Sequence, residues 1–196
     1  LIKNKKISAY ITDHRYYSLT DINKYFLTCN FFKNIKKFIF LDRDGVLNTK
    51  PKKGHYVKSL NEFKWRPGSI KGLKFLGEKK IKIIIISNQA GISLNKVSLE
   101  NLNKINNYIQ EKASKIGANV ERVIFCPHHW NEKCSCRKPK PGMFYIAQKL
   151  FNLDLTSSIF VGDQKTDKIA ASKADVPYFQ LTKKHSLYSL LKKIYI

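Results

Sequence analysis

Short apolar runs alternate with segments of helical periodicity along most of the chain. Such runs suit central parallel strands that are covered on both faces, and leucine and isoleucine at three- and four-residue spacing indicates amphipathic helices. The strands are expected at 38–41, 81–86, 123–125, 158–161 and 178–181, and the helices at 69–79, 98–116, 143–151 and 186–193. This alternation predicts an α/β fold with a parallel, Rossmann-like sheet and helices on both faces.

The N-terminal segment, residues 1–35, does not share this alternation. Its stretch 12–18 resembles the last strand and turn of sugar nucleotidyltransferases, and the chain starts with Leu1 instead of Met. We therefore expect residues 1–35 to be an N-terminal extension, the tail of a preceding nucleotidyltransferase-like domain that is covalently fused to the main domain. That main domain is expected at 36–196.

The overall composition is that of an ordinary globular domain. Hydrophobic residues make up 43% of the 196 residues, enough for one domain with a sizeable core. The sequence has no apolar stretch that approaches the length of a membrane span, and its start lacks the apolar core and cleavage site of a secretory signal. We expect a cytoplasmic protein that makes no membrane contact.

The chain is also strongly basic. It carries 37 Lys and Arg against 14 Asp and Glu, a formal net charge of +23 that invites a nucleic-acid or phosphate partner. Almost all of this charge is Lys spread along the chain, and only five residues are Arg, the side chain that base-reading surfaces favour. We interpret the charge as compositional bias and do not expect a nucleic-acid partner.

Polar side chains directly follow three of the predicted strands. Asp42 and Asp44 follow the first strand, Ser87 follows the second, and Asp163 follows the fourth. Two carboxylates separated by one residue repel each other unless a cation or a proton relieves them, although a polar turn is the plain alternative. Because ligands of parallel sheets bind beyond the carboxyl ends of the strands, three such ends predict a site for magnesium and phosphate.

These residue types permit phosphoryl transfer. A carboxylate such as Asp42 is a competent nucleophile toward phosphorus if a cation offsets the charge of the phosphate. Asp42 and Asp163 can supply oxygen atoms to magnesium, and Asp44 can protonate the leaving oxygen and later activate water. Ser87 and Lys138 are the candidates that bind the remaining phosphoryl oxygens.

Four short motifs resemble, in order, those of the haloacid dehalogenase superfamily of phosphohydrolases: Asp42-Arg43-Asp44-Gly45, Ser87-Asn88, Lys138, and Gly162-Asp163 followed by Asp167. The resemblance implies an aspartyl-phosphate intermediate on Asp42 and a magnesium cofactor, to which the main-chain carbonyl of Asp44 would also bind. We further expect Arg43, Asn88 and Gln89 to contact the substrate. No inserted segment is large enough to form a cap domain, so the active site should be open apart from its loops.

Three of the four cysteines cluster with a histidine. Cys126 and His128 form a Cys-x-His pair, Cys134 and Cys136 form a Cys-x-Cys pair after five intervening residues, and Cys29 stands apart. Three thiolates and an imidazole make a closed tetrahedral zinc set, whereas a disulfide framework belongs to an oxidising compartment. Buried cysteines beside a surface histidine are the alternative. We predict a zinc ion that staples this loop and fixes the basic residues that follow it.

The cysteine-rich loop, with Cys136-Arg137-Lys138-Pro139 and Pro141-Gly142-Met143, looks like the zinc loop of D-glycero-D-manno-heptose 1,7-bisphosphate 7-phosphatases. Histidinol-phosphate phosphatases carry a similar loop, and polynucleotide 3'-phosphatases of the same superfamily are a further alternative. The resemblance implies that the substrate is a small phosphorylated sugar and that Arg137 recognises its second phosphate. Gln164 stands where many of these enzymes have Lys, and Tyr56 either shapes the sugar site or only packs. We place both residues near the substrate.

Overall fold

The computed structural model describes residues 21–26, 38–52 and 54–195. The chain divides into two units, 1–34 and 35–196. Most of the predicted N-terminal extension lies outside the described residues, so its relation to a nucleotidyltransferase stays a prediction.

Five parallel strands form one sheet in the order β3-β2-β1-β4-β5. The strands are β1 (Phe38–Leu41), β2 (Lys82–Asn88), β3 (Asn119–Cys126), β4 (Ile159–Gly162) and β5 (Tyr178–Gln180). The chain builds the sheet outward from β1 through β2 to β3 and then returns to the other side of β1 with β4. The strand order therefore reverses between β1 and β4, and this is the place where open α/β sheets bind their ligands.

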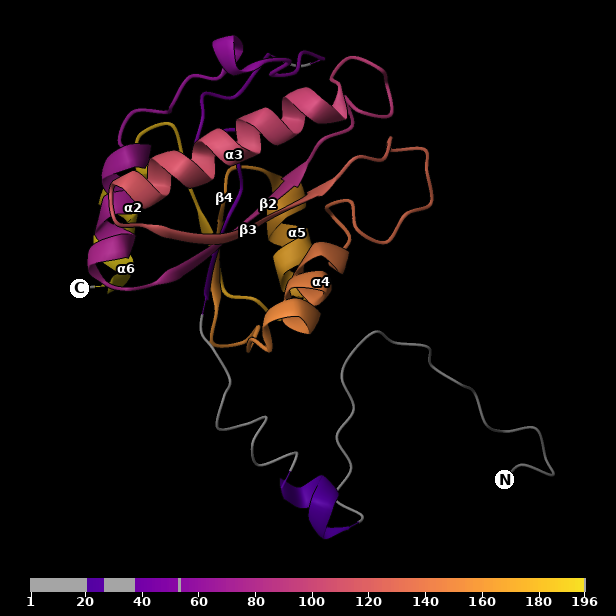
Figure 1. Ribbon diagram of the computed structural model, residues 1–196, viewed down its shortest axis with the longest axis vertical. Helices are drawn as coiled ribbons and strands as arrows, with labels where there is room; N and C mark the ends of the chain where they lie inside the picture. Colours follow the sequence, from indigo (N-terminus) through magenta and orange to yellow (C-terminus); the bar gives the residue numbers. More distant parts are fainter. Residues whose placement is uncertain (1–20, 27–37, 53, 196) are drawn as a thin grey trace, which may run out of the picture. The chain divides into compact units, whose positions relative to one another are not determined.

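Helices cover both faces of the sheet (Figure 1). The helices are α2 (Ser69–Glu78), α3 (Leu99–Lys115), α4 (Gly142–Phe151), α5 (Lys165–Lys173) and α6 (Leu187–Tyr195), and a short 3-10 helix, η2, spans Leu60–Glu62. One core lies between the sheet and α2, α3 and α6, and the other lies between the sheet and α4 and α5. Among the described residues, no helix combines the length and the apolar character that a bilayer crossing requires.

The four residues of β1 show how an apolar run serves both cores. Ile39 and Leu41 point into the core beneath α2, α3 and α6, whereas Phe38 and Phe40 point into the core beneath α4 and α5. All four are buried, and each such side chain contributes about 1.5–3 kcal/mol through removal from water. The predicted fold class, with its central strand buried on both faces, is confirmed.

Two elements differ from the sequence-based expectation. Strand β3 was expected only at 123–125, but it begins at Asn119, because an edge strand that pairs with β2 alone tolerates polar side chains. Helix α5 was not expected, since it is short and its buried face is made chiefly of Ala170 and Ala171. Small alanine side chains give a weak apolar period, although alanine itself favours helix.

Candidate active site

Asp42, the first acidic residue after β1, lies where the strand order reverses. Its main-chain N–H donates to the carbonyl of Val161 in β4 (2.9 Å), so the strand pairing extends to this residue. The residue is 2% exposed, and its Oδ1 accepts from the N–H of Arg43 (2.8 Å). Burial raises the pKa of the Asp42 carboxyl to about 7, although the charge of Lys138 opposes this change. A cation bound beside Asp42 would favour its charged, nucleophilic form.

Lys138 is the buried cation that faces Asp42. It is 3% exposed, and its ammonium nitrogen lies 2.9 Å from Oδ1 of Asp42 and 2.7 Å from Oδ1 of Asp167. The same nitrogen donates to the carbonyl of Ile86 in β2 (3.2 Å). Burial lowers the pKa of Lys138, but the two carboxylates outweigh it and hold the pKa above its ordinary value. Lys138 is therefore a fixed positive charge beside the predicted nucleophile.

The end of β2 contributes a clamp and a hydroxyl group. The side-chain amide of Asn88 donates to the carbonyl of Lys138 (2.9 Å), and its oxygen accepts from the Lys138 N–H (3.0 Å). The amide predicted to contact the substrate is thus occupied by the main chain of Lys138. Ser87 is buried at the same sheet edge, and its Oγ accepts from the amide of Gln89 (2.8 Å).

Three carboxylates converge beside Lys138. Oxygen atoms of Asp42, Asp163 and Asp167 all lie within 4.8 Å of one another. Oδ1 of Asp163 is buried and has no hydrogen-bond partner among the described residues. A Cβ atom placed on Gly45, whose φ is +96°, would lie 2.4 Å from Oδ2 of Asp163, so only glycine lets the turn approach so closely. Crowded carboxylates with one unsatisfied oxygen fit a magnesium ion.

Asp44 lies in a separate network of donors. Its carboxylate accepts from the Arg43 guanidinium (2.9 and 3.0 Å), from Asn48 (2.9 Å) and from Gln89 (2.8 Å). Burial alone would raise the pKa of Asp44, but the charge of Arg43 and these hydrogen bonds hold it below its ordinary value. Arg43 is 1% exposed and holds the Asp44 carboxylate through these hydrogen bonds, and its predicted contact with the substrate stays a prediction.

The predicted zinc ligands lie together at the end of β3. Ligand atoms of Cys126, His128, Cys134 and Cys136 all fall within 4.8 Å of one another. The sulfur atoms of Cys126 and Cys134 are 3.8 Å apart, and Nδ1 of His128 lies 3.3 Å from the sulfur of Cys136. Two thiolates at about 2.3 Å from a tetrahedral zinc ion would be separated by about 3.8 Å. The cluster therefore fits a structural zinc ion.

Comparison with known proteins agrees with this geometry. A family model described as "Polynucleotide kinase 3 phosphatase" matches residues 37–186. The D-glycero-beta-D-manno-heptose-1,7-bisphosphate 7-phosphatase of Helicobacter pylori is 35% identical over 144 residues, which cover 73% of this chain and 82% of that protein. The corresponding alpha-anomer enzyme of Photorhabdus laumondii is 34% identical over 154 residues, which cover 75% of this chain and 82% of that protein. The chain belongs to the heptose bisphosphate phosphatase family.

A solved structure of this family has the same fold. It is the D,D-heptose 1,7-bisphosphate phosphatase from B. bronchiseptica, complexed with magnesium and phosphate. The two chains are 26% identical and align with a TM-score of 0.74 over 81% of this chain and 98% of that one. The resemblance to haloacid dehalogenase phosphatases that the sequence motifs predicted is thereby confirmed.

Three further residues of this heptose bisphosphate phosphatase family member were predicted to contact the substrate. Arg137 is half-buried, and its guanidinium donates to the carbonyl of His128 in the zinc loop (3.1 Å). Tyr56 packs near Gly91, and the ammonium of Lys96 lies 5.8 Å from the centre of its ring. Gln164 is exposed at the start of α5. All three stay predictions as substrate contacts.

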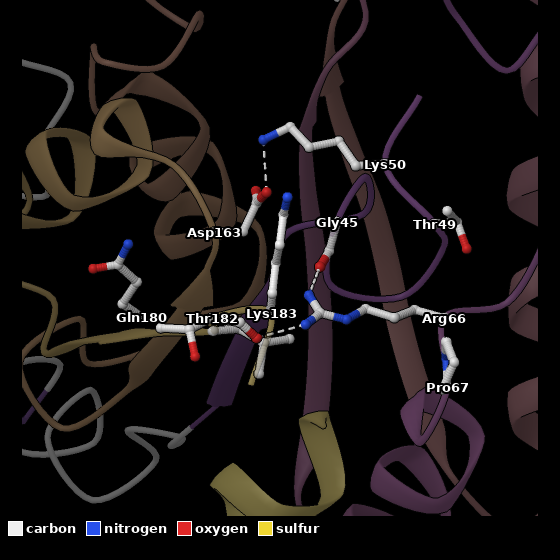
Figure 2. A pocket seen from close by; sticks show the side chains of 10 residues that line it. Gly45, Thr49, Lys50, Arg66, Pro67, Asp163, Gln180, Thr182 and Lys183 are labelled. Carbon is white, nitrogen blue, oxygen red and sulfur yellow. Dashed lines mark hydrogen bonds and ion pairs between the residues drawn. The ribbon is translucent and has the colours of Figure 1, made fainter. Parts of the chain in front are cut away.

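Three residues gain a role only from the structure. The ammonium of Lys50 lies 2.6 Å from Oδ2 of Asp163. The guanidinium of Arg66 donates to the carbonyl of Gly45 and to that of Thr182 (2.6 Å), as Figure 2 shows. Asp167 belongs to the fourth motif, but only the structure shows that it pairs with Lys138. Lys50 and Arg66 belong to no motif, so nothing in this Lys-rich sequence distinguishes them from other basic residues.

Proposed function

We propose that this protein is a magnesium-dependent phosphomonoesterase that removes the 7-phosphate of D-glycero-D-manno-heptose 1,7-bisphosphate. The observation that carries the proposal is the buried carboxylate of Asp42, which faces Lys138 and two further carboxylates at the strand-order reversal. The heptose bisphosphate phosphatases that resemble this chain supply the substrate class. They support this substrate over histidinol phosphate.

The chain's own residues can divide the reaction between them. The Asp42 carboxylate attacks phosphorus, the bond from phosphorus to the sugar oxygen breaks, and the aspartyl-phosphate forms, while Lys138 offsets the negative charge of the phosphoryl oxygens. Water then attacks the same phosphorus, which releases inorganic phosphate and restores the Asp42 carboxylate. Ser87 offers a hydroxyl group to the same oxygens. A magnesium ion held by Asp42 and Asp163, with the Asp44 carbonyl as a predicted further ligand, would reduce charge repulsion between nucleophile and phosphate when bound.

Asp44 is the candidate for the proton transfers. Its donors, chiefly Arg43, favour the charged carboxylate, which is the form that accepts a proton from the attacking water in the second step. The first step needs the protonated form to release the sugar oxygen, and the same donors disfavour that form.

A substrate panel tests the proposal. The panel contains both anomers of the heptose bisphosphate, histidinol phosphate and a 3'-phosphorylated oligonucleotide, assayed on the full chain with magnesium and zinc. We expect kcat/KM to be highest for one of the two heptose anomers. A higher value for histidinol phosphate or for the oligonucleotide would refute the proposed substrate, although it would leave the aspartyl-phosphate chemistry standing.

The zinc staple yields a separate prediction. Cys134→Ser should reduce the zinc content from one ion per chain to near zero and lower kcat/KM at least about tenfold, because the loop that positions Arg137 and Lys138 loses its cross-link. Metal analysis and kinetics on the same sample measure both effects. Cys29→Ser, which changes a cysteine that the sequence places apart from the cluster, is the control. Full zinc content in Cys134→Ser, or full activity without zinc, would contradict the prediction.

A further inference from the structure

Lys50 forms an ion pair with one of the carboxylates that fit the magnesium ion. Its ammonium nitrogen lies 2.6 Å from Oδ2 of Asp163, as Figure 2 shows. The Lys50 side chain is 46% exposed, whereas that of Asp163 is only 12% exposed. A surface lysine usually keeps its ammonium in water, because exposed ion pairs gain little. Here the ammonium instead reaches from the surface to the edge of the reaction centre.

The contacts of Lys50 fix its base more firmly than its tip. The N–H of the preceding residue, Thr49, donates to the carbonyl of Lys64 (2.8 Å). The ammonium, in contrast, has Asp163 as its single ion-pair partner among the described residues. Lys138 differs, since it is 3% exposed and is held by two carboxylates. The long, flexible side chain of Lys50 can therefore exchange one partner for another.

Two lysines share the three carboxylates of the cluster between them. Lys138, which is buried, pairs with Asp42 and Asp167, and Lys50 pairs with Asp163. Each carboxylate of the cluster thus has an ammonium partner within the chain itself. The other oxygen of Asp163, Oδ1, is buried and has no hydrogen-bond partner among the described residues. Because two cations at the same carboxylate repel each other, Lys50 and a magnesium ion compete for Asp163.

Lys50 also lines two neighbouring pockets. One pocket, of about 640 Å³, has Asp163 in its wall, and the other, of about 670 Å³, has Tyr56 in its wall. Thr49 and Lys50 belong to both walls. Both volumes are within the range of small-molecule sites, which is about 300–1,000 Å³. An anionic substrate that reaches the carboxylates through either pocket therefore meets the ammonium of Lys50.

The charge balance of the loaded site favours a move of Lys50 from Asp163 to the phosphate. A magnesium ion and Lys138 together carry less positive charge than the negative charge of the three carboxylates and a phosphate dianion. A further cation at the phosphoryl oxygens therefore lowers the repulsion between nucleophile and substrate. Once magnesium neutralises Asp163, the phosphate dianion attracts the ammonium of Lys50 more strongly, and a lysine needs no fixed fork geometry to bind it.

We propose that Lys50 binds two partners in turn, Asp163 in the metal-free protein and the transferred phosphate in the magnesium-loaded enzyme. The proposal rests on the proposed function, because it presumes that a phosphate is transferred to Asp42. It gives the reaction a catalytic residue that lies outside the four motifs. Lys50 is also a tethered competitor of magnesium, so its removal has opposite effects on the binding of metal and of phosphate.

Two calorimetric titrations measure these opposite effects. Magnesium is titrated into the zinc-loaded, substrate-free wild type, Lys50→Met and Lys50→Arg, and inorganic phosphate is then titrated into the same proteins with saturating magnesium. We expect Lys50→Met to lower the Kd for magnesium about fivefold, because an ion pair no longer opposes the metal. The Kd for phosphate should rise about tenfold, because a charged donor is lost. Lys50→Arg keeps the charge and should restore both values in part.

Lys52→Met is the matched control. Lys52 is exposed in the same loop and lines the pocket that contains Tyr56 but not the one that contains Asp163. Its replacement removes the same charge and should leave both Kd values unchanged. Structural damage near the carboxylates would weaken magnesium binding, so tighter binding in Lys50→Met is a result that a merely structural role does not produce.

Three results would overturn the proposal. An unchanged or higher Kd for magnesium in Lys50→Met would show that Lys50 does not compete with the metal. An unchanged Kd for phosphate would show that the phosphate is not its second partner. Equal shifts in Lys52→Met would reduce both effects to general charge. Failure of the proposed function is seen separately: if both shifts appear but the wild type hydrolyses neither heptose bisphosphate anomer, that function fails and the role of Lys50 stands.

Discussion

Replacing Asp42 by Asn should abolish turnover, with kcat reduced at least about a thousandfold, while the protein stays folded. The amide has the size of the carboxylate but lacks the charge needed to attack phosphorus. Because burial already raises the pKa of Asp42 to about 7, a neutral side chain is tolerated there, and Lys138 keeps Asp167 as its partner. Initial rates with magnesium and urea unfolding of the same sample measure the two outcomes.

Asp175→Asn is the matched control for this variant. Asp175 is exposed and adopts a positive φ of 53°, a conformation that Asn accepts readily. The control should keep both its activity and its stability. Near-normal activity in Asp42→Asn would refute the mechanism in which Asp42 forms a covalent intermediate.

Replacing Lys138 by Met should destabilise the protein and disable the site together. The change leaves Asp42 and Asp167 buried side by side without their shared counter-charge, which costs about 3–5 kcal/mol of the free energy of unfolding in magnesium-free buffer. With magnesium present, kcat should fall about 10²–10³-fold, because the phosphoryl oxygens lose a preorganised cation. Urea unfolding and steady-state kinetics measure the two effects.

Two further variants show whether this cost comes from the unpaired carboxylates. Lys133→Met removes an exposed charge from the same loop and should change neither stability nor activity. Adding Asp167→Asn to Lys138→Met should restore part of the lost stability without restoring activity, since only one buried charge then remains unpaired. A stability of Lys138→Met within about 0.5 kcal/mol of the wild type would contradict the ion-pair interpretation.

The residues of the reaction centre were predictable from the sequence where a recognisable local pattern, such as an apolar strand, lies next to them. Asp42 and Asp163 follow apolar strands directly, and the four zinc ligands lie within one short loop, so their types and spacing indicate their chemistry. Asp44 was predictable as a polar strand end, but its donor Gln89, which directly follows β2, lies 45 residues away. A contact of that kind depends on how β1 and β2 pair and leaves no mark on the local sequence.

The pocket lined by Gly45, Asp163 and Thr182 could not be predicted from the local sequence. It is built where the turn after β1 meets the loop after β5, and Arg66 joins the two by hydrogen bonds that span 21 to 119 residues. The signal for α5 was weak for a different reason, since its buried face is made chiefly of alanine. The Lys-rich composition also makes Lys50, which pairs with Asp163, indistinguishable by sequence from the many lysines that lie on the surface.

Phosphorus NMR of the reaction on heptose 1,7-bisphosphate shows whether the protein removes the 7-phosphate. The spectrum distinguishes the phosphate on carbon 7 from the one on carbon 1, so it reports both whether the ester is cleaved and which end enters the site of Asp42. We expect the 7-phosphate resonance to disappear, inorganic phosphate to appear in equal amount, and the 1-phosphate to remain. Loss of the 1-phosphate first, or no cleavage of either anomer by the magnesium- and zinc-loaded protein, would contradict this expectation.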